Sequence, residues 1–189
     1  MLYFITGASG SGKTACIQDL KQALPKAAIY DFDDIGVPKD ADTVWRQQAT
    51  EQWLQRYLKE RENVDHFCIC GGAVLGEILA CPSATQLDNI NVCFLDVSDL
   101  ERIRRLQSRG MGGVNQDMLN WASWLRVHHA DPQWQQHVIQ HNAWSGLDFS
   151  RWDNLDSWKS LAKVTTLDTT DMSIVQVVMG LVDWIKGVK

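Results

Sequence analysis

Short apolar runs alternate with longer amphipathic segments along the whole chain. Five of the runs have the length and the β-branched or aromatic content of buried strands, namely residues 2–6, 27–31, 66–70, 91–96 and 163–167. Helical segments separate them, and strands that alternate with helices form βαβ units around a parallel sheet. The pattern predicts an α/β fold with five parallel strands and helices on both faces. In such sheets ligands bind beyond the carboxyl ends of the strands.

The helical segments are recognised by their apolar period and by their start and stop signals. Between the second and third runs, Trp45, Ala49, Trp53 and Tyr57 recur every fourth residue along one stripe. A Ser-Asp-Leu-Glu sequence that begins at Ser98 has the form of a capping box. The predicted helices cover residues 14–24, 42–62, 98–109, 115–129, 131–140 and 172–186. Residues 142–156 are expected to form an irregular loop.

The first apolar run leads directly into the sequence GASGSGKT, a complete G-x-x-x-x-G-K-[ST] phosphate loop. The loop comprises Gly7, Ala8, Ser9, Gly10, Ser11, Gly12, Lys13 and Thr14. Strand, glycine loop and helix are the arrangement in which backbone N–H groups surround phosphate oxygens. Lys13 is expected to reach the β- and γ-phosphates and the Thr14 hydroxyl to ligate Mg²⁺. The alternative is an ordinary glycine-rich turn; the context favours nucleotide binding.

Three carboxylates lie at the end of the second predicted strand, in the sequence Tyr-Asp-Phe-Asp-Asp. If the segment stays extended, Asp31 and Asp33 point to the same side and Asp34 points to the other. Like charges this close repel each other unless a cation or a polyhydroxylated ligand lies between them. Phosphoryl transfer to a hydroxyl requires positioning of Mg²⁺ and a group that orients or deprotonates the acceptor. A solvated acidic turn that caps the next helix is the alternative.

Together these segments resemble the shikimate- and gluconate-kinase group of small-molecule P-loop kinases, which are related to the nucleoside monophosphate kinases. The resemblance rests on the phosphate loop paired with an Asp-x-Asp after strand two, and on the Gly-Gly pair after strand three. It extends to residues 94–98, which lead into an arginine cluster, and to residues 167–171 after strand five. It implies a P-loop NTPase fold, a three-layer α/β/α sandwich with a five-stranded parallel sheet and a helical lid insertion.

The resemblance also implies roles for single residues. Asp31 would orient Mg²⁺-bound water, and Asp33 would bind the acceptor hydroxyl and act as its base. Gly71 and Gly72 would let the acceptor approach the backbone. The implied lid arginines are Arg105 and Arg109, and the residues implied beside the base of ATP are Asp168, Thr169 and Thr170.

Two departures from the family pattern prevent the transfer of a substrate. Ala73 stands where shikimate kinases carry a third glycine, and about fifty residues separate Arg109 from the fifth predicted strand. We therefore expect one domain over residues 1–189, with residues 110–157 as a helical insertion on the lid and acceptor side. Five of the nine tryptophans lie between Trp121 and Trp152. They either pack this insertion or stack on a ring-bearing substrate.

Arg46 lies on the helix that follows the carboxylates, next to Trp45. An arginine there can bind an anionic group of the acceptor by a bidentate contact. A surface salt bridge explains the residue equally well, and the sequence leaves both open.

The composition disfavours several classes of function. With 45% hydrophobic and 22% charged residues the chain is typical of a globular protein, and its net charge of −5 disfavours broad attraction to nucleic acid. No apolar stretch has the length of a membrane span, and no signal segment precedes the first strand, so a cytoplasmic location is expected. The five cysteines form no C-x-x-C pair and no zinc-binding spacing with the five histidines. His137 and His141, four apart on one predicted helix face, offer a possible metal pair. No H-E-x-x-H motif or nearby Cys or Asp set completes it, so surface histidines are expected.

The sequence thus predicts an ATP-dependent kinase of a small hydroxylated metabolite or nucleoside. Two other functions stay open. A P-loop ATPase or GTPase adaptor is supported by residues 92–96, which have the form of a Walker B strand, although no N-K-x-D guanine motif is present. A polynucleotide 5′-hydroxyl kinase would use the tryptophans and arginines to bind a single strand. Neither the acceptor, nor turnover as opposed to nucleotide binding, nor the oligomeric state follows from the sequence.

Overall fold

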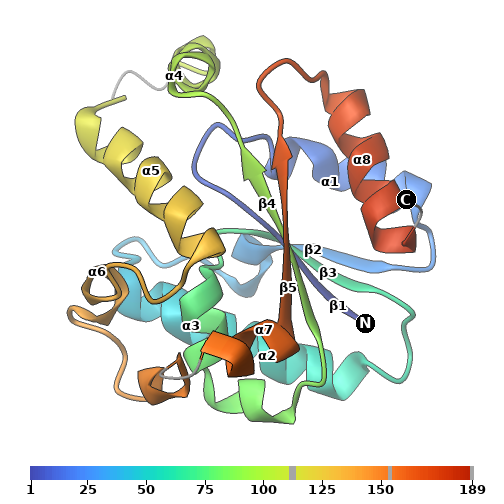
Figure 1. Cartoon of the computed structure of the whole chain (residues 1–189). Helices are drawn as coiled ribbons and strands as arrows, with labels where there is room; N and C mark the ends of the chain where they lie inside the picture. Colours follow the sequence, from blue (N-terminus) through green and yellow to red (C-terminus); the bar gives the residue numbers. More distant parts are fainter. Residues whose placement is uncertain (111–113, 153–154, 188–189) are drawn as a thin grey trace.

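A computed structural model of the chain describes residues 1–110, 114–152 and 155–187. Its centre is a five-stranded sheet in which every paired strand is parallel, with the order β2-β3-β1-β4-β5 (Figure 1). The strands are β1 (Leu2–Thr6), β2 (Ala28–Asp31), β3 (Phe67–Gly71), β4 (Ile90–Asp96) and β5 (Ala162–Asp168). All five predicted strands are confirmed to within one residue at each end.

The strand order places the functional segments next to one another. β1 lies in the centre, with Thr6 opposite Gly71 of β3 on one side and Phe94 of β4 on the other. Because all the strands run the same way, the segments that follow them meet at one edge of the sheet. The phosphate loop, which follows β1, therefore lies between the segments that follow β3 and β4.

Helices cover both faces of the sheet, which confirms the three-layer sandwich (Figure 1). On one face α1 (Ile17–Ala23) and α8 (Ile174–Lys186) contact each other. Their apolar side chains form one core cluster with the strand residues of that face, among them Ile5 and Leu95. The N-terminal part of α1 is preceded by a 3-10 turn at Thr14–Cys16.

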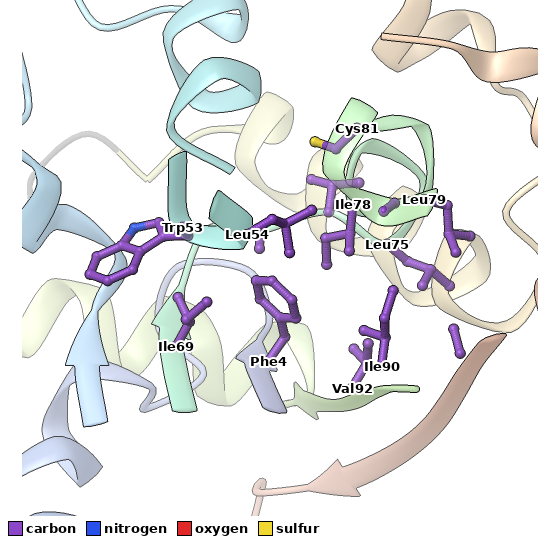
Figure 2. Packing of buried hydrophobic residues seen from close by; sticks show 14 of the residues in the cluster. Phe4, Trp53, Leu54, Ile69, Leu75, Ile78, Leu79, Cys81, Ile90 and Val92 are labelled. Atoms are coloured by element: carbon purple, nitrogen blue, oxygen red, sulfur yellow. The ribbon is translucent and has the colours of Figure 1, made fainter. Parts of the chain in front are cut away.

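The second face is covered by α2 (Thr43–Glu60), α3 (Leu75–Ala80) and α5 (Gln116–Ala130). Figure 2 shows how side chains of α2 and α3 pack on the strands of this face. The labelled strand residues are Phe4, Ile69, Ile90 and Val92, and the labelled helix residues include Trp53, Leu54, Leu75, Ile78 and Leu79. The predicted stripe of α2 faces this core, with Ala49 and Trp53 almost fully buried.

Several predicted boundaries differ from the structure. The helix α3 was not predicted from the pattern, because all six of its residues are buried and no polar face marks the period. Of the predicted helix over residues 131–140 only α6 (His137–Gln140) is helical. The predicted loop over residues 142–156 contains a 3-10 segment (Phe149–Trp152) and the start of α7 (Leu155–Leu161).

The helix α4 (Asp99–Ser108) follows β4, and its start corrects one detail of the sequence analysis. Ser98 caps the helix by accepting a hydrogen bond from the N–H of Glu101. The Glu101 carboxylate does not complete a capping box. It instead accepts hydrogen bonds from Arg104 and Arg105 within the same helix.

The segment between α4 and β5 packs against the second face of the sandwich. Ala122, Trp124 and Leu125 of α5 and Ile139 of α6 belong to the same core cluster as α2 and α3. Trp121 and Trp124 stack on each other, with ring centroids 5.1 Å apart, whereas Trp134 is 43% exposed. The tryptophans of this segment thus serve partly as packing residues. Residues 111–113, in the predicted break after α4, lie outside the described residues. The lid function of the segment stays a prediction.

Within the described part of the chain, no helix combines the length and the hydropathy that a transmembrane segment requires.

Candidate functional site

The phosphate loop wraps from the end of β1 into the 3-10 turn that leads to α1. Two of its glycines are required by the geometry. A side chain at Gly7 would collide with the carbonyl oxygen of Leu95 in β4. Gly12 has a φ of 101°, a conformation that side-chain-bearing residues rarely adopt. The glycines of the motif therefore permit both the close approach to β4 and the turn into the helix.

The inside of the loop carries unused hydrogen-bonding groups. In the described part of the chain, the N–H groups of Gly10, Gly12 and Lys13 make no hydrogen bond to a carbonyl or a side chain, and the fully buried Ser11 hydroxyl has no partner. Buried polar groups of this kind are normally satisfied in proteins. N–H groups at the start of a helix are suited to bind phosphate oxygens, so the loop meets the requirements of an anion-binding site.

Lys13 folds back over the loop. Its ammonium donates to the carbonyl oxygens of Gly7 at 2.6 Å and Ala8 at 3.0 Å. Burial, reinforced by the positive charge of Arg102, lowers the pKa of Lys13 to about 8, while Asp31 and Asp33 act in the opposite direction. Lys13 is therefore held at the loop, and both carboxylates act on its charge. Its predicted contact with the β- and γ-phosphates stays a prediction.

The loop is held in place from outside by Arg102 of α4, a residue to which the sequence analysis gave no role of its own. Its guanidinium is 1% exposed and donates to the carbonyl oxygens of Ser9 at 2.6 Å and Val97 at 3.1 Å. The carboxylate of Asp96 lies 3.6 Å away and is also bound by Arg126 of α5. Asp96 thus connects α4, α5 and the end of β4. The run of arginines after β4 is the sequence feature that could have pointed to the interaction of Arg102 with Asp96.

Arg105 contacts the loop after β5. It donates to the hydroxyl of Thr169 at 3.1 Å and to its carbonyl oxygen at 2.5 Å, and it pairs with Glu101. Thr169 in turn is fully buried, and its hydroxyl lies within hydrogen-bond distance of the carbonyl oxygens of Ser11 and Asp96. In this structure Arg105 and Thr169 therefore brace the phosphate loop. The role of Arg105 on a transferring phosphate stays a prediction.

A cavity of about 280 Å³ lies beside the phosphate loop, between α4 and the start of α8; we name it the α4–α8 cavity. Arg109, the other predicted lid arginine, lines it and is exposed. The loop after β5 lines the cavity with Met172. Asp168, at the end of β5, instead accepts a hydrogen bond from the hydroxyl of Thr170. The residues that line the cavity are Gly12, Glu101, Arg104, Arg105, Ser108, Arg109, Met172, Ser173 and Ile174. Met172, Ser173 and Ile174 had no predicted role, because nothing in a helix start marks a residue that lines a cavity.

Two of the three carboxylates, Asp33 and Asp34, lie in a 3-10 segment, Phe32–Ile35, and Asp31 at the end of β2 caps this segment. Asp31 accepts a hydrogen bond from the N–H of Asp33, and Asp34 accepts one from the N–H of Asp31. The segment is therefore a capped turn, not the extended strand on which their orientation was predicted. Partial burial and then the negative charge of Asp31 raise the pKa of Asp33, while Lys13 acts against this. Asp31 and Asp33 thus both interact electrostatically with Lys13. The role of Asp33 as a base stays a prediction.

The two glycines after β3 differ in their surroundings. A side chain at Gly71 would collide with the side chain of Phe32, so the small residue is needed for packing of the carboxylate segment. Gly72 is exposed, and a side chain there would meet nothing within 4 Å. Gly72 leaves open space at the edge where an acceptor is predicted.

Arg46 makes the bidentate contact that the sequence analysis considered, but its partner is a residue of this chain. Its Nε and Nη2 atoms donate to Glu77 of α3 at 2.9 and 2.7 Å, and its guanidinium lies 5.3 Å from the ring centroid of Trp121. The Glu77 side chain is fully buried and also accepts a hydrogen bond from Gln47. Arg46 therefore forms a salt bridge with Glu77, whose side chain is buried. Binding of an acceptor by Arg46 stays a prediction.

The predicted oxygen ligands of Mg²⁺ are the hydroxyl of Thr14, which is exposed at the start of its turn, and the carboxylate of Asp31. Among the described residues no cluster of three or more His, Cys, Asp or Glu side chains could hold a metal ion unaided. Mg²⁺ at nucleotide sites typically uses one or two protein ligands together with phosphate oxygens and water. The hard oxygen donors near the loop fit that requirement.

No family model and no curated protein matches the sequence. Solved structures do resemble its fold. A sugar kinase from Janibacter sp. is similar with a TM-score of 0.59 at 12% identity, covering 98% of this chain and 94% of its own. A shikimate kinase from Acinetobacter baumannii has a TM-score of 0.57 at 14% identity, with 100% and 94% covered. The tunicamycin resistance protein of Deinococcus radiodurans has a TM-score of 0.59 at 13% identity, with 100% and 96% covered.

At these identities the likeness establishes the fold and leaves the substrate open. The predicted resemblance is confirmed at that level: the chain has the α/β fold of P-loop small-molecule and nucleotide kinases.

Proposed function

We propose that this protein is an ATP-dependent phosphotransferase that moves the γ-phosphoryl group of MgATP to a hydroxyl group of a small metabolite or nucleoside. The observation that carries the proposal is the electrostatic interaction of Lys13, at the phosphate loop, with Asp31 and Asp33 at the same edge of the sheet. In the proposed scheme this arrangement would join a site for the triphosphate to a site for the acceptor. Similar folds among sugar, shikimate and deoxyadenosine kinases support it.

In the proposed reaction the loop N–H groups and Lys13 bind the β- and γ-phosphates. The acceptor oxygen attacks the γ-phosphorus, the bond from that phosphorus to the β-phosphate oxygen breaks, and ADP leaves. The proton of the acceptor hydroxyl passes to the carboxylate of Asp33, whose raised pKa makes it a better base than an exposed aspartate. Mg²⁺, held by Thr14 and Asp31 together with phosphate oxygens, would neutralise charge on the phosphates.

The remaining predicted residues are assigned within this scheme. We assign the α4–α8 cavity to the base and ribose of the nucleotide, because it adjoins Gly12 and the loop after β5. Arg109 at its rim is the arginine best placed to close over the phosphates, since Arg105 already binds Glu101 and Thr169. Gly72 would face the acceptor. Arg46, held by Glu77, would orient any anionic group of the acceptor with its remaining N–H groups.

One observation weighs against an ATPase or GTPase that activates water with Asp96. Both oxygens of the Asp96 carboxylate accept hydrogen bonds from Arg126, and one also accepts from the N–H of Val97. A carboxylate whose two oxygens are bonded in this way holds helix α5 in place and is not available to activate water. The adaptor and polynucleotide-kinase alternatives gain no specific support from the geometry.

The test is an ADP-release screen of purified protein with MgATP against a library of hydroxylated metabolites, nucleosides and sugars, each compared with a water blank. The proposal predicts that at least one acceptor raises ADP release well above the blank. Asp33→Asn should abolish this increase while MgATP binding persists. ADP release that no acceptor in the library increases, or an Asp33→Asn variant with full transfer activity, would contradict the proposal.

A further inference from the structure

The outer edge of β5 carries hydrogen-bonding groups that the fold does not use. β5 is the last strand in the order β2-β3-β1-β4-β5, so only one of its two edges is paired, with β4. The N–H of Thr169, just after the strand, donates to the carbonyl oxygen of Asp96 in β4. Because successive residues of a strand turn their N–H and C=O groups to opposite edges, Val164, Thr166 and Asp168 point theirs away from β4. In the described part of the chain, the N–H groups of these three residues have no partner.

This edge lacks the features that normally protect an edge strand. Edge strands are usually very short, covered by another segment, or interrupted by proline or charged residues. β5 has seven residues and no proline, and its central Val-Thr-Thr-Leu sequence is uncharged. Figure 1 views the molecule onto this edge, and between α7 and the loop after the strand no described helix lies in front of β5. The other edge strand, β2, has only four residues. β5 is therefore the edge that is suited to accept a further strand.

A second copy of β5 fits this edge in the antiparallel orientation. Two such copies are related by a two-fold axis perpendicular to the sheet. Directly opposite residues lie on the same face of a sheet, so the axis passes through a residue position and not between two positions. With the axis at Thr165, the middle residue, all seven residues of both strands are paired. Val164 then lies opposite Thr166 of the second copy, and their outward N–H and C=O groups bond to each other. Any shift of the axis leaves residues at both ends unpaired.

The charges along the strand agree with this orientation. Lys159 and Lys163 are exposed at the start of β5, whereas Asp168 is exposed at its end. Antiparallel pairing brings the basic start of each strand next to the acidic end of the other, and opposite charges across a sheet stabilise the pairing. A cavity of about 490 Å³, lined by both lysines, lies beside the start of the strand, between the end of α5, α7 and β5. Asp168 of the second copy would lie opposite Ala162, which lines the same cavity.

We propose that the free edge of β5 is the interface of a two-fold symmetric dimer, in which the sheets of two copies of this chain join into one continuous sheet. The strand is about 23 Å long, and the three layers of the sandwich make this side roughly 30 Å high. The contact therefore covers at most roughly 700 Å² of each copy, slightly below the roughly 800 Å² of a standard interface. A contact of this size predicts a dimer with a dissociation constant in the micromolar range.

Analytical ultracentrifugation between about 1 and 200 µM measures the oligomeric state, and single cysteines test the register. In the proposed pair the two copies of Thr165 lie opposite each other with Cα atoms about 4.5 Å apart, within the range of a disulfide. The native cysteines are all buried, so mild oxidation reaches the introduced thiol. Thr165→Cys should therefore form a covalent dimer on a non-reducing gel. Lys163→Cys is the matched control, because it is exposed on the same face of the strand but its two copies lie about 14 Å apart. It should not cross-link.

A proline tests whether the outward N–H groups carry the association. The N–H of Thr166 points away from β4, so Thr166→Pro keeps the pairing with β4 and removes one hydrogen bond per copy from the dimer. The dissociation constant should rise at least about tenfold. Val175→Lys, at a residue of α8 that is 63% exposed, is the control and should leave it unchanged. If Thr166→Pro does not fold, Thr165→Lys takes its place, because it sets two ammonium groups opposite each other and should weaken the dimer about fivefold.

The proposal is overturned if the wild type is still monomeric at about 200 µM, in which case the edge is left to a strand of another protein. It is equally overturned if the protein dimerises but Thr165→Cys cross-links no better than Lys163→Cys. A folded Thr166→Pro that dimerises as the wild type does, or a dimer that Val175→Lys dissociates instead, would also overturn it. These measurements need neither ATP nor turnover, so their outcome is independent of the proposed kinase activity.

Discussion

Replacing Arg102 by methionine tests whether this buried arginine holds the phosphate loop in place. The guanidinium donates to the carbonyl oxygens of Ser9 and Val97 and lies next to Asp96. Methionine keeps most of the apolar stem, which packs against Gly10. It removes two hydrogen bonds from a charged donor and leaves two carbonyl groups without their partner.

The structure allows the size of the effect to be worked out. Hydrogen bonds that involve a charged group contribute about 1.5–3 kcal/mol each. Asp96 remains paired with Arg126, so no isolated carboxylate is left behind. We therefore expect Arg102→Met to lower the free energy of unfolding by at least about 3 kcal/mol, the lower end for two such bonds. In urea denaturation this corresponds to a midpoint lower by at least about 1 M. MgATP should also bind at least about tenfold more weakly, because the loop loses two of its contacts.

Arg104, two positions along the same helix, offers the control for stability. Its side chain is 72% exposed and pairs with Glu101 on the surface. Exposed ion pairs contribute at most about 1 kcal/mol, so Arg104→Met should leave the urea midpoint nearly unchanged. Equal destabilisation by the two substitutions would refute the reasoning that burial of Arg102 and its contacts to the loop determine its contribution.

Three further predictions follow from pKa shifts. Burial and the charge of Asp31 raise the pKa of Asp33, so the charged carboxylate opposes folding above that pKa. Asp33→Asn should therefore raise the free energy of unfolding at pH 7 and should give no gain in strong acid. A variant that is less stable than the wild type at pH 7 would count against this. The pKa of Lys13 is lowered to about 8, and bound phosphates would raise it. MgATP binding should therefore take up protons near pH 8 and weaken above it; calorimetric enthalpies that do not depend on the protonation enthalpy of the buffer would disprove this. Burial lowers the pKa of His129 from 6.5 to about 4, so only the unfolded chain binds its proton between these values, and stability is lost as the pH falls through this window. His129→Phe should flatten this loss in urea denaturation, and parallel curves for variant and wild type would show that another group is responsible.

The strands and the phosphate loop could be predicted because their signals are local. Buried parallel strands are nearly continuous apolar runs, and β1 and β4 have this pattern. The phosphate loop requires its residues at fixed spacing, so it is recognisable without knowledge of any other segment. Helix α3 could not be found in the same way, because six wholly buried residues carry no amphipathic period.

The partners within the site could not be predicted because they are far apart in the chain. Arg46 and Glu77 are separated by 31 positions, and only the packing of α2 on α3 brings them together. Arg126 reaches Asp96 in the same way, from a helix whose placement the pattern does not determine. The order of the strands is likewise a property of long-range pairing.

The most direct test of the central claim is calorimetric titration of MgATP into the wild-type protein and into Lys13→Ala. The account predicts a one-to-one binding isotherm for the wild type. It predicts a loss of most of the affinity in Lys13→Ala, with an unchanged circular dichroism spectrum showing that the fold persists. Absence of binding heat in the wild type, or equal affinity in both proteins, would contradict the claim that the loop over residues 7–14 binds the nucleotide phosphates.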